Sequence, residues 1–178
     1  MDPLETLKYP IGRFKFPQPY DEVNIDSHVA VIKTLPIRLG EAVKELSEQQ
    51  LDTPYRDGGW TIRQVVHHLA DSHINSYCRF KLAMSENNPE IKTYREELWA
   101  EFADGKSGPV NLSLNLLEAV HARWIIFLNS ISKDDYNKAF FHPEHKRSVS
   151  LLHALTLYSW HCNHHLAHIT ELKKRKGW

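Results

Sequence analysis

Residues 160–169 read Trp160-His161-Cys162-Asn163-His164-His165-Leu166-Ala167-His168-Ile169 and hold four of the chain's twelve histidines. At about 100° of rotation per residue in an α-helix, His161 and His165 lie one turn apart, and all four histidines face the same way. Two neutral imidazoles at positions i and i+4 can converge on one divalent ion at about 2.0–2.1 Å from each nitrogen. The stretch therefore predicts a helix that supplies part of a metal site.

These histidines occupy positions where an amphipathic helix buries apolar side chains. They alternate at spacings of three and four with Leu151, Ala154, Leu155, Tyr158 and Leu172. Each imidazole buried without a partner would cost about 1–3 kcal/mol. The pattern therefore favours a shared ion, and a metal-free cluster of hydrogen-bonded core histidines is the alternative.

Length and composition favour one domain over residues 1–178, with residues 1–21 as an extended, proline-rich arm. The chain is 42% hydrophobic, and its 22 lysines and arginines balance its 22 aspartates and glutamates. Such a balance provides no net field for nucleic acid or an acidic membrane surface. Cys78 and Cys162 form no Cys-x-x-Cys pair, and no apolar run has signal-peptide or membrane-spanning length. We therefore expect a cytoplasmic protein with neither nucleic-acid nor membrane partners.

Helical periodicity predicts an all-α chain with four long helices. They are expected at 22–46, 61–86, 113–131 and from Ser150 onward. The second should begin with a capping box from Thr61 to Gln64, and Pro36 should kink or interrupt the first. Shorter elements are expected at 94–103, as a helix, and at 140–143 and 147–149, as a small hairpin. Four such helices most economically form a four-helix bundle with the metal site inside.

A three-ligand site needs a side chain from a second helix, and the helix after Gly58-Gly59 offers His67, His68 and His73. The apolar face of that helix is centred near His73, whereas His68 lies about 120° and His67 about 140° from the centre, on opposite sides. Periodicity therefore predicts that His73 is the most buried. It leaves open whether His73 is a ligand or a hydrogen-bonded core residue, and whether His68 binds from the edge of the stripe.

Other polar residues have weaker signals. Asp71 lies three positions after His68 and could buttress a ligand, although aspartates on helices are usually solvated. Arg79 could bind a substrate carboxylate, although salt bridges are the more common use. We expect His142 and His145 at the surface, because Pro143 breaks their segment.

Several motifs together resemble the DinB/YfiT-like superfamily over essentially the whole chain. The first reads Pro54-Tyr55-Arg56-Asp57-Gly58-Gly59-Trp60-Thr61, followed by Arg63-Gln64-Val65-Val66-His67-His68-Leu69-Ala70-Asp71-Ser72-His73. The last helix matches with Trp160-His161, His164-His165 and Ala167-His168-Ile169-Thr170-Glu171-Leu172. Shorter matches are Tyr9-Pro10-Ile11-Gly12 and Phe141-His142-Pro143.

The resemblance implies a homodimeric protein with a DinB-type four-helix bundle and one divalent metal ion per chain, zinc or, as the alternative, nickel. Matched to the motifs, the ligands become His68, His161 and His165, so that His68 replaces His73 as the preferred ligand of the second helix. Asn163 departs from a position that is often histidine in close relatives. Neither ligand of the last helix is affected by this departure.

The resemblance also implies a metal-dependent hydrolase acting on a small-molecule substrate. Three protein ligands leave a coordination position open for water. The alternative is a bacillithiol-type S-transferase, in which a low-molecular-weight thiol takes that position. A third possibility is a non-catalytic structural or sensing site, closed by a fourth ligand such as His73 or His164. No residue is assigned a catalytic role, and His164 and His168 are candidates for orienting the ligands.

Overall fold

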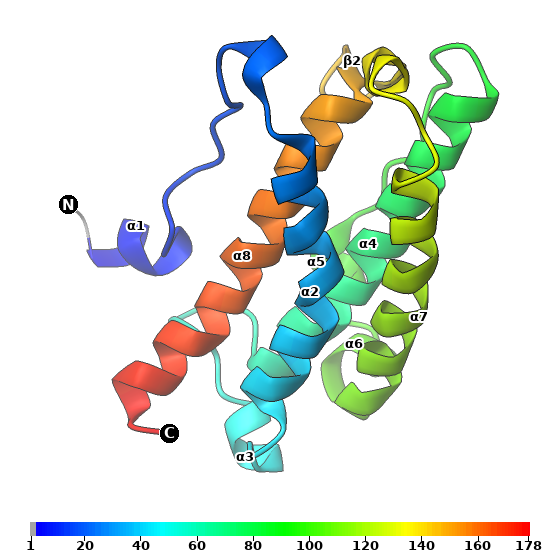
Figure 1. The fold of residues 1–178 in the computed structure, drawn as a ribbon. Coiled ribbons are helices and arrows are strands. Elements are labelled where there is room, and N and C mark those ends of the chain that lie inside the picture. The colour runs from blue at the N-terminus through cyan, green and yellow to red at the C-terminus, as the bar shows by residue number, and fades with distance from the viewer. Residues whose placement is uncertain (1–2) are drawn as a thin grey trace.

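The computed structural model describes residues 3–178, and four long helices dominate it. They are α2 (Ile25–Val43), α4 (Ile62–Ser85), α7 (Val110–Leu128) and α8 (Leu151–Lys176). Helices α2 and α8 run in one direction, and α4 and α7 run in the other (Figure 1). Contacts between neighbours follow the order α2, α7, α4, α8 around the bundle. The predicted all-α four-helix bundle is confirmed.

The two helices that carry most of the histidines begin where local capping signals place them. The Thr61 hydroxyl accepts a hydrogen bond from the Gln64 backbone N–H, and the Gln64 side chain accepts one from the Thr61 N–H. At α8, the Ser150 hydroxyl accepts from the His153 N–H. Both predicted starts are confirmed, and in each the N-cap side chain satisfies an N–H group that has no partner within the helix.

Shorter elements connect these helices. They are α3 (Glu48–Leu51), α5 (Glu96–Trp99), α6 (Ala103–Ser107), the 3-10 helices η1 (Tyr20–Glu22) and η2 (Asp134–Asn137), and the strands β1 (Ala139–His142) and β2 (Arg147–Ser150). The strands form an antiparallel pair in which Phe140 lies opposite Val149, so the predicted hairpin is confirmed. The single helix expected at 94–103 is instead two short ones, α5 and α6.

The N-terminal arm is only partly extended. Helix α1 (Pro3–Lys8) occupies its first part, so the prediction of an extended arm over residues 1–21 is wrong there, and residues 1–2 lie outside the described chain. Proline suits the first helical position, where its missing N–H costs nothing. The arm lies alongside α8 (Figure 1), where the His168 Nε2–H donates to the Lys8 carbonyl at 3.1 Å and the Trp160 Nε1–H to the Gly12 carbonyl at 3.2 Å.

Helix α2 continues through Pro36, so the predicted interruption is absent. Proline has no N–H to donate to the carbonyl four residues earlier, which belongs to Ile32. That carbonyl instead accepts a hydrogen bond from Nδ1 of His121 on α7, at 2.6 Å. A side chain from a neighbouring helix thus replaces the donor that proline lacks.

The core lies between the four helices and is apolar except for histidines and a few other polar groups. Trp124, Phe80, Leu155 and Ile169 are completely buried, and so is His73. Cys162 is buried, Cys78 is exposed, and both are free thiols. Within residues 3–178, no helix is both long and apolar enough to cross a bilayer.

Candidate metal centre

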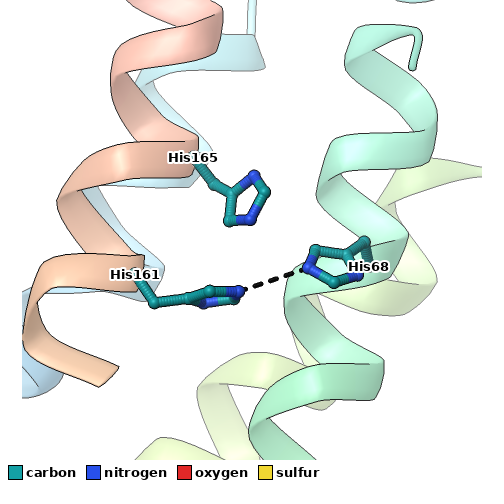
Figure 2. A group of neighbouring side chains, drawn as sticks. All are labelled: His68, His161 and His165. Atoms are coloured by element: carbon teal, nitrogen blue, oxygen red, sulfur yellow. Dashed lines mark hydrogen bonds between the residues drawn. The ribbon is translucent and has the colours of Figure 1, made fainter. Parts of the chain in front are cut away.

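Three histidines from two helices meet inside the bundle. His161 and His165 come from α8 and His68 from α4, and their ligand-capable atoms all lie within 4.8 Å of one another. Figure 2 shows the three rings pointing toward one another across the gap between these helices. The Nε2 atoms of His68 and His161 are 3.2 Å apart. Two nitrogens on one tetrahedral zinc ion, each at about 2.0–2.1 Å, would be about 3.3 Å apart. We call these residues the inner trio.

Burial keeps the inner trio neutral. His68 and His165 are buried and His161 is half-buried. Desolvation, with a smaller contribution from neighbouring imidazoles, lowers the pKa of His68 to about 3. For the same reason the pKa values of His161 and His165 lie well below the ordinary value. Neutral imidazoles are the form that binds a metal ion, so these side chains suit one at neutral pH.

The other two histidines of α4 lie outside the group of ligand-capable atoms that the inner trio forms. His67 donates from Nε2 to the Gly108 carbonyl at 3.0 Å, and its Nδ1 accepts from the Ser113 hydroxyl at 2.7 Å. His73 is the most buried of the three, as periodicity predicts. Its Nε2 lies 3.2 Å from Nδ1 of His161, which is the ring nitrogen opposite the one that faces His68.

A second group forms farther along α8, where His164 and His168 approach His165, again with ligand-capable atoms within 4.8 Å. His164 stacks on Trp160 with ring centroids 4.3 Å apart, and His168 stacks on Tyr55 at 4.0 Å. Burial lowers the pKa of His164 to about 3 and that of His168 to about 4. Both Nδ1 atoms are buried without a hydrogen-bond partner in the described chain. We call His164 and His168 the outer pair.

Two cavities border the inner trio. The smaller, of about 320 Å³, is lined by His68 and the histidines of α8. Its lining also includes four aromatic residues, Tyr9, Tyr55, Trp60 and Trp160. The larger, of about 560 Å³, lies beside the hairpin and includes Tyr94, Tyr158 and His153 in its wall. Within residues 3–178, His161 and Glu96 are the residues that line both cavities.

The structure confirms some of the predictions for the other polar residues and contradicts others. Arg79 lines the larger cavity with its Nε buried and unpartnered, and it makes no salt bridge within residues 3–178, contrary to expectation. His145 is exposed as predicted, but His142 is half-buried, and the two stack at 4.1 Å beside the same cavity. Burial raises the pKa of Asp71 to about 6, and the described region shows no hydrogen bond between its carboxylate and the ring of His68.

Two residues of this region are absent from the sequence-based predictions. His121 lies on the buried stripe of α7, four residues after Leu117 and three before Trp124. The histidines of α8 have the same spacing from their buried neighbours. That spacing was a usable signal. Glu96 begins α5 in a long connection, and nothing in its local sequence distinguishes it from its neighbour Glu97.

A helical bundle with histidines from two helices converging beside open cavities defines a class of candidate metalloproteins. The family model of the DinB superfamily matches residues 33–169, and the chain belongs to this superfamily. The resemblance inferred from the motifs is therefore confirmed.

Relatives in Bacillus share nearly the full length of the chain. A protein of Bacillus cereus (strain 03BB102) is 52% identical and one of Bacillus anthracis (strain A0248) 51%, each over 98% of this chain and 100% of the relative. Both are named "Putative metal-dependent hydrolase". The structure of YfiT from Bacillus subtilis, described as a probable metal-dependent hydrolase with an unusual four-helix bundle topology, has a TM-score of 0.93 and 47% identity, covering 97% of this chain and 99% of that one. These names, together with the histidine groups, support metal dependence.

Proposed function

We propose that this chain is a metal-dependent hydrolase whose divalent ion is held by His68, His161 and His165. The observation that carries the proposal is the convergence of three neutral imidazoles from two helices beside two cavities. Imidazole donors suit zinc, which we propose as the ion, and nickel is the alternative. When bound, such an ion supplies Lewis acidity, which lowers the pKa of a water molecule and polarises a substrate carbonyl.

The surroundings of the inner trio favour an open coordination position over a closed structural site. Both ring nitrogens of His73 are engaged, one with His121 and the other with His161, so His73 is not available as a fourth ligand. The ligand-capable atoms of His164 are not part of the group that the inner trio forms, and its ring stacks on Trp160. Three protein ligands with an open fourth position are typical of catalytic zinc sites. These contacts support catalysis over a purely structural role.

Glu96 is the side chain best placed to move a proton. Among the described residues it is the one carboxylate that borders both cavities. Partial desolvation, with smaller contributions from the charges of Glu97 and Glu144, raises its pKa above the ordinary value of 4.5. A carboxylate oxygen with a raised pKa accepts a proton from water more readily. We propose Glu96 as the general base.

A glutamine at position 96 tests this assignment, because it keeps the shape of the side chain and removes its basicity. Glu96→Gln should lower kcat by about 10²- to 10⁴-fold, the usual range for loss of a general base. Its metal content should equal that of the parent. Glu97→Gln is the matched control, since Glu97 lines only the larger cavity. Equal activity of the two variants would remove Glu96 from the mechanism.

The larger cavity suits a small-molecule substrate. Its volume of about 560 Å³ falls in the range of small-ligand sites, about 300–1,000 Å³. Arg79 lines this cavity and has no salt-bridge partner in the part of the chain that the structure describes. A guanidinium can bind a carboxylate through two hydrogen bonds. We therefore expect Arg79 to favour substrates that carry an anionic group.

Thiol transfer is the second candidate function, and the pair of cavities is the observation that favours it. Because both cavities border His161, the centre has room for two reactants on different sides. A low-molecular-weight thiol would be activated as a thiolate beside an electrophile. Hydrolysis requires only one organic substrate.

One experiment separates these functions. Protein prepared without a histidine tag is loaded with zinc or nickel and incubated with chromogenic esters and amides, then with an electrophile and a set of small thiols. Metal-dependent cleavage without thiol supports the hydrolase, whereas a thioether product that requires both thiol and metal supports the transferase. His68→Ala is the control for adventitious metal. Absence of both activities in the loaded parent would contradict a catalytic role.

A further inference from the structure

A chain of hydrogen bonds behind His161 crosses all four helices of the bundle. It begins at the Ile32 carbonyl on α2, which lies 2.6 Å from Nδ1 of His121 on α7. Nε2 of His121 lies 2.7 Å from Nδ1 of His73 on α4. Nε2 of His73 lies 3.2 Å from Nδ1 of His161 on α8. His73 is completely buried and His121 is 2% exposed, so water cannot readily take the place of either ring.

The first member of the chain fixes the direction of every later bond. A carbonyl oxygen can only accept, so the proton of His121 is on Nδ1. Pro36 has no N–H to donate to this carbonyl. The His121 imidazole therefore takes the place of the missing backbone donor. A neutral imidazole carries one N–H, so Nε2 of His121 is an acceptor. His73 must therefore donate to it from Nδ1.

The same reasoning extends to the inner trio. With its proton on Nδ1, His73 has a bare Nε2, which accepts from the Nδ1–H of His161. The lone pair of His161 then lies on Nε2. That nitrogen faces Nε2 of His68 at 3.2 Å, inside the inner trio. The chain of bonds thus places the His161 lone pair on the side where the ligands converge.

We propose that His73 and His121 are positioning residues, which hold His161 in the one tautomer that can bind an ion between His68 and His165. The effect of this tautomer on metal binding rests on the proposed function, whereas the presence of the proton on Nδ1 of His161 does not. Histidine ligands commonly donate their second ring N–H to an acceptor, and losing that acceptor costs about 10- to 100-fold in metal affinity. Here the acceptor is the imidazole of His73. The position of its proton is fixed through His121 by the Ile32 carbonyl. His165 lacks such support, because its buried Nδ1 has no partner in the described chain.

The proton position can be read directly in the parent protein. Long-range ¹H–¹⁵N correlation spectra of the metal-free chain at neutral pH distinguish protonated from bare ring nitrogens. The His161 signals are assigned by their loss in His161→Ala. We expect protonated Nδ1 and bare Nε2 for His121, His73 and His161. A proton on Nε2 of His161 would overturn the inference without affecting whether the protein binds metal.

Two substitutions at His73 test the functional consequence. In His73→Gln the side-chain carbonyl can take the place of Nε2 and accept from His161, whereas His73→Leu leaves no acceptor. Zinc affinity, measured by competition with a chelator, should fall about 10- to 100-fold in the leucine variant and stay near the parent value in the glutamine variant. Equal affinities of the two folded variants would overturn the positioning role.

Two safeguards keep the inference distinguishable from the proposed function. Thermal unfolding of both variants shows that they are folded, and if the leucine variant is not, the spectrum of the parent decides alone. A parent that binds no zinc but carries the His161 proton on Nδ1 would refute the proposed metal centre and leave the hydrogen-bond chain intact.

Discussion

The inner trio and the outer pair lie side by side on α8, yet they are built differently. Each contains two histidines of this helix at a spacing of four. The inner trio gains a third ring from α4 and is backed by a hydrogen-bond chain through the bundle. The outer pair approaches His165, and its other neighbours are aromatic rings and the backbone of the N-terminal arm. Both groups have the same spacing on one helix, so the convergence of a ring from a second helix is what distinguishes the inner trio from the outer pair.

The largest effect should come from exchanging one histidine of each group for alanine. His68→Ala removes the only inner ligand from α4, and we expect loss of the bound ion and of hydrolysis. His168→Ala should retain both, because it removes a ring that contacts Tyr55 and Lys8. Metal content and metal-dependent turnover of the two purified variants provide the measurement. Metal loss in His168→Ala together with retention in His68→Ala would reverse the roles of the two groups.

Acid should destabilise the metal-free protein, mainly through these same histidines. Their folded pKa values are lowered by burial, to about 3 for His68 and about 4 for His168, from an ordinary value of 6.5. The unfolded chain therefore binds more protons, so this stability is fully present above pH 6.5 and is lost as pH falls toward the folded values. Urea unfolding of chelator-treated protein across this range should show a steadily falling free energy of unfolding. A constant value from neutral pH down to pH 4 would contradict burial of neutral imidazoles.

The smallest effect should come from the arm that covers the outer pair. The Tyr9 ring lies 5.8 Å from that of His164, and aromatic pairs contribute about 0.5–1.5 kcal/mol. Tyr9→Ala should lower the free energy of unfolding by at least about 0.5 kcal/mol, because the area that the ring buries is lost as well, and should leave the metal content unchanged. Denaturant unfolding and elemental analysis of the same sample check both parts. A variant that loses its ion would show that the arm contributes to the centre itself.

Local signals in the sequence were sufficient where the structure depends on near neighbours. The capping residues Thr61 and Ser150 mark the starts of α4 and α8 because their partners lie three residues away. That Pro36 does not interrupt α2 could not be predicted locally, because the donor that compensates for it, His121, lies 89 residues from Ile32. The helix at the start of the arm was missed, although Pro3 at its first position is a recognised signal.

The choice between His67 and His68 could not be made from periodicity. Residues 62–70 of α4 are all buried, because α6 and the segment before α7 cover the side that an amphipathic pattern assigns to solvent. With no exposed face in these turns, the direction of each ring depends on contacts with distant segments. His67 is fixed by Gly108 and Ser113, and the position of His68 against α8 became predictable only through the family motif.

The most direct test of the inner trio as a metal centre is elemental analysis of the purified protein, expressed without a histidine tag, beside its His161→Ala variant. If the inner trio is a metal centre, we expect about one zinc or nickel ion per chain in the parent and almost none in the variant. Equal metal content in the two proteins, or none in either, would contradict a metal centre at these residues.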